Sequence, residues 1–581
     1  MRKLKQYYRR FTGQDLPARE MILKLPTPAQ TAKNKAPKAS ELILPKLPNH
    51  SPEPLEELRL AVSFLRRQNQ ARMASLRRFA WAERIMRRFC PLALELVRKN
   101  AHDGAVPDSQ ERQQALEVSA ELLRRLLDAY RIIFKDWYGA GNFRFARVRK
   151  KFETCAWRLI DLSHFWQRAL GLRYRVLPDA AWLAINQAYF AMRELGQAEN
   201  ELYGIEDIYA EERKPRTLQH QYLVLQMIAR LDILRWPTEW HFTLDGYGRI
   251  AHALIKLEED GGNIVRPDYA LAFSYDAGPA RAFRPPGAAL GKSVLLNWKN
   301  LRMKLQRDYQ RNLEFQTKAI DQRAFAMLSF NDGLALLELQ KRCWDALPLP
   351  LPERDARAEQ CDLRIFVGFK GIYPFLYSLH YGTGPTEQVG ERMVDLLAQR
   401  SALFAEDHTA TTDSIWLMLE QNAQRLTLRT QETAWTTQMR IGSLAAYGLG
   451  AQGLLSSALG NISRIYRPHL TDGQAAQVVV EIEKMSAFSE PVLLHSEMRM
   501  YETFQDKAEG LQYALLALQE AGAASTVGAA QGANLMLPAH APMVEGAQVV
   551  MKRVGRVQKV RIGALLRAAK TWRCHSYEVL A

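Results

Sequence analysis

Residues 287–293, with the sequence GAALGKS, are the segment closest to a phosphate-binding loop. In that motif four residues separate the first glycine from the second, which makes the loop long enough for its backbone amides to encircle a phosphate. Here only three residues separate Gly287 from Gly291, and no clear hydrophobic strand precedes them. We therefore interpret the segment as a glycine-containing turn.

Candidate metal ligands are sparse. His495 and Glu497 alternate in HSEMRMYE, so on a strand both would lie on one face. A zinc site needs further ligands at a recognisable spacing, and the sequence has none there. The cysteines stand singly, without a CxxC pair, which predicts neither structural zinc nor disulfides but buried thiols. They are Cys90, Cys155, Cys343, Cys361 and Cys574.

The familiar catalytic signatures are missing from the sequence. It contains no HExxH, no GxSxG and no GxGxxG behind a strand, and no set of acid, base and nucleophile stands out. This reasoning leaves open a catalytic set assembled from residues distant in sequence. We expect a protein without a catalytic centre or a cofactor, built to bind rather than react.

The elements that position any site fall into two halves. From about residue 54, runs such as QALEVSAELLRRLLDAYRIIF repeat apolar residues at helical spacing, which predicts an α-helical domain over residues 54–346. Within it, the glycines and alternating residues of 246–278 indicate a short insertion or hairpin. Five tryptophans there could line an aromatic groove, but core packing is favoured because each lies in or beside an amphipathic run. They are Trp157, Trp166, Trp182, Trp236 and Trp240.

The second half is expected to be a β region. Prolines 348, 350 and 352 mark a linker over residues 347–362, and beyond it short alternating runs end in Gly, Pro or polar clusters. Residues 363–581 therefore predict an antiparallel barrel or open sheet, with one helix near residues 388–406. The expected fold class is α+β multidomain.

The formal net charge is +17, and about half of the excess lies in residues 1–50, with eleven Lys or Arg against three Asp or Glu. We interpret residues 1–53 as a disordered basic tail that contacts acidic surfaces. No run of eighteen apolar residues and no signal peptide is recognisable, so we expect a cytoplasmic protein without a transmembrane segment. Specific nucleic-acid binding would rest on charge alone and is not expected.

Four stretches follow one another in an order typical of one family. They are YRVLPDAAWLAINQAYFAMREL, LQHQYLVLQMIARLDILRWP, ERDARAEQCDLRIFVGFKGIYPFLY and the C-terminal LPAHAPMVEGAQVVMKRVGRVQKVRIGALLRAAKTWRCHSYEVL. The order resembles large bacterial PilZ-domain proteins of the cyclic di-GMP receptor type, which carry an N-terminal helical region. The resemblance covers most of the chain after residue 55 and implies a PilZ-like β-barrel and cyclic di-GMP as ligand.

The resemblance also implies where the nucleotide would bind. PilZ domains use an RxxxR segment and a [D/N]xSxxG turn, because guanidinium groups pair with phosphates and guanine edges and a glycine lets the ligand approach the backbone. Here the arginines are Arg354 and Arg357, three positions apart instead of four. The turn is SLAAYG, with Ser443 at the first position, Ala445 where serine is expected, and Gly448.

The ligand residues implied in this way are Arg354, Arg357, Arg440, Ser443 and Gly448. Because both elements depart from the pattern, two functions stay open. One is a cyclic di-GMP-binding effector in signalling with a degenerate PilZ motif. The other is a nucleotide-independent scaffold that recruits protein partners, whose identity the sequence does not reveal.

Overall fold

The computed structural model describes most of the chain between residues 53 and 580. The described ranges are 53–71, 73–102, 110–201, 217–259, 269–273, 294–314, 330–345, 359–361, 363–368, 371–373, 416–437, 439–449, 458–468, 476–496, 511–518, 533–538, 545–553, 556–569 and 572–580, with a few single residues. The chain divides into two compact units, a helical unit made mainly of residues up to 304 and a β unit made mainly of residues from 351 onward.

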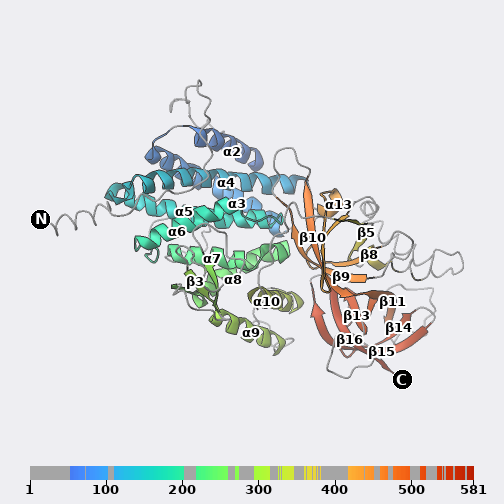
Figure 1. Cartoon of the computed structure of the whole chain (residues 1–581). Helices are drawn as coiled ribbons and strands as arrows, with labels where there is room; N and C mark the ends of the chain where they lie inside the picture. Colours follow the sequence, from blue (N-terminus) through green and yellow to red (C-terminus); the bar gives the residue numbers. More distant parts are fainter. Residues whose placement is uncertain are drawn as a thin grey trace. The chain divides into compact units, whose positions relative to one another are not determined.

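The helical unit is a stack of amphipathic helices (Figure 1). It contains α2 (Pro54–Gln70), α3 (Ser75–His102), α4 (Gln110–Gly139), α5 (Ala146–Gly171), α6 (Asp179–Glu194), α7 (Leu218–Arg230) and α8 (His241–Ala251), with 3-10 turns at Asn142–Arg144, Thr238–Trp240 and His252–Leu254. The stripe predicted on α4, from Leu116 to Ile133, is at most 3 % exposed. The helices therefore form because their apolar faces bury against one another.

Large aromatic and thiol side chains of the chain are buried, as predicted. The five tryptophans expected to pack in the helical core are at most 5 % exposed, and Cys90, Cys155, Cys343 and Cys574 are also buried. The side chain of Cys361 lies outside the described residues. The aromatic residues thus contribute apolar area to the core rather than a groove.

A small antiparallel sheet interrupts the helices. Its strands β1 (Lys256–Glu259), β2 (Tyr269–Phe273) and β3 (Val294–Asn297) lie in the order β1-β3-β2. Of the segment 246–278, the strand signals are confirmed for β1 and β2, whereas residues 246–254 belong to α8 and a 3-10 turn. Of the two alternatives, insertion or hairpin, the hairpin is wrong, because β1 and β2 each pair with β3 and not with each other. Alternation of side chains identifies a strand without identifying its partner. The helices α9 (Lys299–Glu314) and α10 (Phe330–Asp345) follow.

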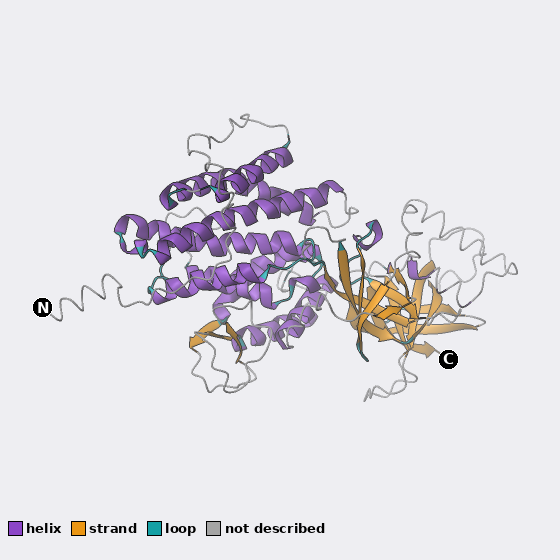
Figure 2. Ribbon diagram, turned by 45° about the horizontal axis from the view of Figure 1, so that its top comes forward, coloured by secondary structure: helices purple, strands orange, loops and turns teal. Residues whose placement is uncertain are grey.

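The β unit contains two sheets (Figure 2). A seven-stranded sheet has the order β4-β6-β7-β10-β9-β8-β5, and a six-stranded closed barrel has the order β11-β12-β13-β16-β15-β14. The strands of the sheet are β4 (Glu359–Cys361), β5 (Leu363–Val367), β6 (Trp416–Gln421), β7 (Arg425–Gln431), β8 (Leu444–Leu449), β9 (Ala458–Tyr466) and β10 (Gln477–Ser486). Those of the barrel are β11 (Phe488–Ser496), β12 (Leu511–Leu518), β13 (Ala533–Pro538), β14 (Gln548–Arg553), β15 (Arg556–Ala568) and β16 (Trp572–Leu580).

The predicted α+β class with a C-terminal antiparallel barrel is confirmed. The sheet and the barrel share one apolar cluster, in which Leu444 and Leu459 of the sheet pack with Leu515, Met536 and Trp572 of the barrel. A second cluster, which includes Leu494, Met551 and Ile562, fills the barrel itself. The shared cluster makes the two sheets one packed body, since separating them would expose apolar surface to water.

Candidate ligand site in the seven-stranded sheet

The structure describes three of the five ligand residues that the resemblance implies. Arg440 and Ser443 lie in the connection between β7 and β8, and Gly448 lies inside β8. Arg354 and Arg357 lie outside the described residues, as do GAALGKS and Glu497, while His495 lies in β11. The part of the predicted site that can be built is therefore the connection that leads into β8.

A tight turn forms the end of this connection. The Ser443 amide donates to the Arg440 carbonyl over 3.2 Å, and Gly442, at the third position, has a φ of +82°. This backbone conformation belongs to a type II turn and favours glycine, because a Cβ would clash there. The Gly442 amide donates to Ile462 on β9 over 2.8 Å, and the Ile462 amide donates to the Ser443 carbonyl over 2.9 Å, so the turn is fastened to the sheet.

The other end of the connection is held by a one-turn helix. In α13 (Ala434–Thr437), the Thr436 amide donates to the Thr433 hydroxyl over 3.2 Å, and the Thr433 amide donates to the Thr436 hydroxyl over 2.7 Å. This reciprocal arrangement satisfies amides at the helix start. The buried Arg467 binds Glu432 over 2.6 Å and donates to the Thr436 carbonyl over 3.1 Å. The backbone that carries Arg440 is thus anchored at both ends.

The turn lies earlier in the sequence than the resemblance predicts. SLAAYG is expected to form the ligand-binding turn with Gly448, but its last five residues lie in β8, and the glycine of the observed turn is Gly442. In β8, Ala445 pairs with Val367 on one side and Gly460 on the other, and Gly448 pairs with Arg364. Gly448 thus lies within the ladder between β5 and β8 and not in a turn, so ligand contact would fall to the turn at Gly442.

Arg440 is the cation in this connection whose guanidinium group is available to a ligand. It is half-buried, and within the described part of the chain its side chain makes no ion pair. By contrast, Arg464 binds Glu481 over 2.8 Å and Arg467 binds Glu432. No local pattern predicts these two ion pairs, because their partners are 17 and 35 positions away in the chain. Ser443, 7 % exposed, lies three positions after Arg440.

The described residues contain no group of three or more His, Cys, Asp or Glu side chains placed to hold a metal ion. Among the helices that the structure describes, none has both the length and the apolar character needed to cross a membrane. The connection therefore offers an arginine, a hydroxyl and a rigid glycine turn, which suit an anion with hydrogen-bonding groups.

Comparison with known proteins bears on the helical unit. Residues 44–237 match the family model described as the N-terminal domain of the cyclic-di-GMP receptor FimW. The helical region is similar to that domain. This confirms the predicted resemblance to a cyclic di-GMP receptor with a helical N-terminal region, over about a third of the chain. The comparisons with curated proteins and with solved structures found no match.

Proposed function

We propose that this chain is a non-enzymatic regulatory protein that binds cyclic di-GMP. The observation that carries the proposal is the match of residues 44–237 to the N-terminal domain of a cyclic-di-GMP receptor. The closed six-stranded barrel at the C-terminal end of the chain is consistent with the PilZ-like domain that the resemblance implies. In this function the chain binds the nucleotide and transmits the signal to a protein partner.

The proposed ligand residues follow from charge and position. Cyclic di-GMP carries two phosphates and two guanines, and a guanidinium can donate two parallel hydrogen bonds to a phosphate or to a guanine edge. Arg440 has its donors available on an anchored connection, next to the Ser443 turn. We propose that Arg440 and Ser443 contact the nucleotide, together with Arg354 and Arg357 from the linker.

Calorimetric titration of the full chain with cyclic di-GMP, and with GTP as the control ligand, tests the proposal. Arg440→Ala should weaken binding roughly 10- to 100-fold, because a hydrogen bond to a charged group contributes about 1.5–3 kcal/mol and each ~1.4 kcal/mol is tenfold. Arg425→Ala is the matched control, since Arg425 begins β7 at the end remote from the connection. It should bind like the unmodified chain.

The remaining outcomes separate the functions. If Arg354→Ala with Arg357→Ala abolishes binding while Arg440→Ala leaves it unchanged, the nucleotide binds through the linker and not through the turn. No saturable binding of cyclic di-GMP by the unmodified chain would refute the receptor function. The buried Ala445 in place of the expected serine would then favour the alternative, a nucleotide-independent scaffold for protein partners.

A further inference from the structure

The outer faces of α2 and α3 form an arginine surface that neither the fold nor the proposed nucleotide site uses. Residues 54–98 contain ten arginines, four glutamates and no lysine. On α2, Arg66 and Arg67 are exposed, opposite the buried Leu58, Ala61 and Leu65. We call Arg66, Arg67, Arg84 and Arg88 the α2–α3 arginine face.

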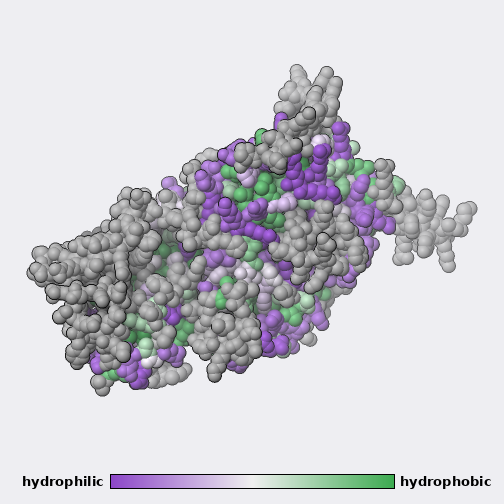
Figure 3. Space-filling view, turned by 180° about the vertical axis from the view of Figure 1, so that it is seen from behind, coloured by the Kyte–Doolittle hydropathy of each residue, from purple (hydrophilic) through white to green (hydrophobic). Residues whose placement is uncertain are grey.

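The two arginines that α3 contributes to this face are also exposed, beside buried apolar residues. Arg84 and Arg88 are exposed and one helical turn apart, while Ile85, Met86 and Phe89 between and beside them are buried. Residues four apart on a helix lie on one face, so these two guanidinium groups point the same way. Seen from behind, the helical unit has hydrophilic side chains beside apolar ones on its surface (Figure 3).

These four arginines form no structural ion pairs within the described residues, where none of the four pairs with a carboxylate. By contrast, Arg59 on α2 pairs with Glu56. Arg84 lies over the ring of Trp81, 5.9 Å from its centroid, and Arg88 lies 5.2 Å from the Phe89 centroid. A stack on an aromatic ring orients the guanidinium and leaves its N–H groups available to an anion.

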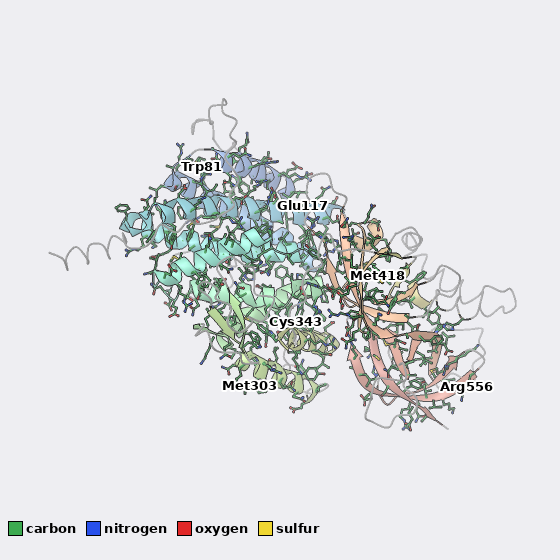
Figure 4. All side chains as sticks on the ribbon, in the orientation of Figure 1. Trp81, Glu117, Met303, Cys343, Met418 and Arg556 are labelled. Carbon is green, nitrogen blue, oxygen red and sulfur yellow. The ribbon has the colours of Figure 1, made fainter. Side chains whose placement is uncertain are left out.

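The two helices meet beside these arginines. Trp81 of α3, labelled in Figure 4, packs against Phe64 of α2 with ring centroids 5.7 Å apart. Leu60 on α2 is 46 % exposed and Leu76 on α3 is 36 % exposed. The surface therefore combines unpaired positive charge, exposed leucine side chains and a half-buried tryptophan.

We propose that the α2–α3 arginine face docks on an anionic lipid surface. Basic residues near a negatively charged leaflet are attracted by its surface potential, and exposed leucines enter the headgroup boundary. The ligand chemistry is the lipid phosphate. A single-stranded nucleic acid fits less well, because it needs accessible aromatic rings for its bases, and the Trp81 ring packs between Phe64 and Arg84.

Co-sedimentation of the full chain with vesicles tests this proposal, which is independent of cyclic di-GMP. One vesicle preparation contains phosphatidylcholine alone and the other phosphatidylcholine mixed with phosphatidylglycerol. The chain should bind only the mixed vesicles, and less as salt is raised. Replacing the four arginines of the face by glutamine should weaken binding about tenfold or more, and circular dichroism should show unchanged helix content, since all four side chains are exposed.

The control removes the same charge elsewhere: Lys299, Arg311, Arg425 and Arg556 are replaced by glutamine. It should bind the mixed vesicles like the unmodified chain. Equal losses in both variants would overturn the proposal, because net charge alone would then explain binding. Undiminished binding by the α2–α3 variant would also overturn it, as would failure of the unmodified chain to bind. Loss of oligouridylate binding in that variant, without vesicle binding by the unmodified chain, would assign the face to RNA instead.

Discussion

Replacing Asp245 by asparagine tests the buried charge cluster of the helical unit. Asp245 lies on α8 and is 5 % exposed. Its Oδ2 accepts from Arg168 over 3.1 Å and from Arg249 over 3.2 Å, and its Oδ1 lies 2.6 Å from Nε2 of His164. The carboxylate thus joins α5 to α8 and balances two guanidinium groups.

The expected loss of stability follows from the buried positive charge that the substitution leaves without a carboxylate at position 245. An asparagine keeps the volume but not the charge, so Arg168, with 4 % of its side chain exposed, remains a buried cation without its carboxylate. Breaking a buried ion pair in this way costs about 3–5 kcal/mol. Because a domain is stable by roughly 5–15 kcal/mol, the variant would lose a large part of its free energy of unfolding.

Hydrogen exchange measured by mass spectrometry resolves this loss within the chain. Amides of α5 and α8 that exchange through global opening of the unit should exchange about 10²- to 10⁴-fold faster in Asp245→Asn, at about 1.4 kcal/mol per factor of ten. Peptides from β15 and β16 should be unaffected. Glu56→Gln is the control, because the Glu56–Arg59 pair is solvent-exposed and contributes at most about 1 kcal/mol. An effect of Asp245→Asn no larger than that of the control would refute the reasoning.

The pH dependence supplies a second test. Burial alone would raise the pKa of Asp245, but Arg168, His164 and Arg249 outweigh it and hold the pKa far below its usual value. A depressed carboxyl pKa contributes stability that is present above the unfolded-state value near 4 and lost as pH falls below it. Because of this carboxyl group, the difference between the unmodified chain and the variant should shrink as pH falls below about 4.

His164 makes the unit sensitive to acid at a higher pH. Burial lowers the pKa of His164, and the opposing effect of Asp245 is smaller. A depressed histidine pKa means that the unfolded chain binds the proton first, so stability falls as pH drops through about 6.5. Both the unmodified chain and the Asp245→Asn variant should show this decline.

Further substitutions test the packing of the helical unit and an ion pair of the β unit. A Cβ on Gly171, at the end of α5, would lie 2.2 Å from Cδ1 of Ile233, whereas one on Gly139, at the end of α4, would meet nothing within 4 Å. Gly171→Ala should therefore destabilise the helical unit by roughly 1–3 kcal/mol in urea unfolding, and Gly139→Ala should not; equal effects would contradict the packing argument. In the β unit, Arg567 of β15 binds Glu483 of β10 over 2.5 Å. Burial would raise the pKa of Glu483, but Arg567, Arg342 and Arg235 together outweigh it, so the pKa is lowered. Glu483→Gln should therefore cost about 1 kcal/mol at pH 7 and little below pH 4, and it should speed exchange in β10 and β15. A loss independent of pH would show that the charge is not involved.

Local patterns were enough to predict the helices and their buried faces. The apolar residues of the α4 stripe recur at helical spacing, the core tryptophans lie in or beside amphipathic runs, and a helix closes its hydrogen bonds within one segment. Short alternating runs also predicted an antiparallel β region from residue 363 onward, where β5 to β16 lie. Strands such as β9, with Gly460 and Asn461 in ALGNISRIY, were missed because a strand depends on partners elsewhere in the chain.

The candidate site was likewise predicted only in part from the sequence. The sequence singled out Arg440 and Ser443 through a resemblance, but the turn that joins them depends on Gly442, whose role appears only from its positive φ and its hydrogen bond to β9. The turn lies before SLAAYG because Leu444 to Gly448 belong to β8, where Gly448 pairs with Arg364 of β5.

By itself the sequence determined an α-helical half, a β half, the absence of familiar catalytic motifs and a resemblance to cyclic di-GMP receptors. These follow from composition and from short-range periodicity. Only the tertiary structure decided which charged residues form ion pairs, as Arg467 and Asp245 do, and which do not, such as Arg440 and Arg84 within the described residues. The physical reason is that a charge is neutralised by its neighbours in space, and those neighbours can be 77 positions away in the chain.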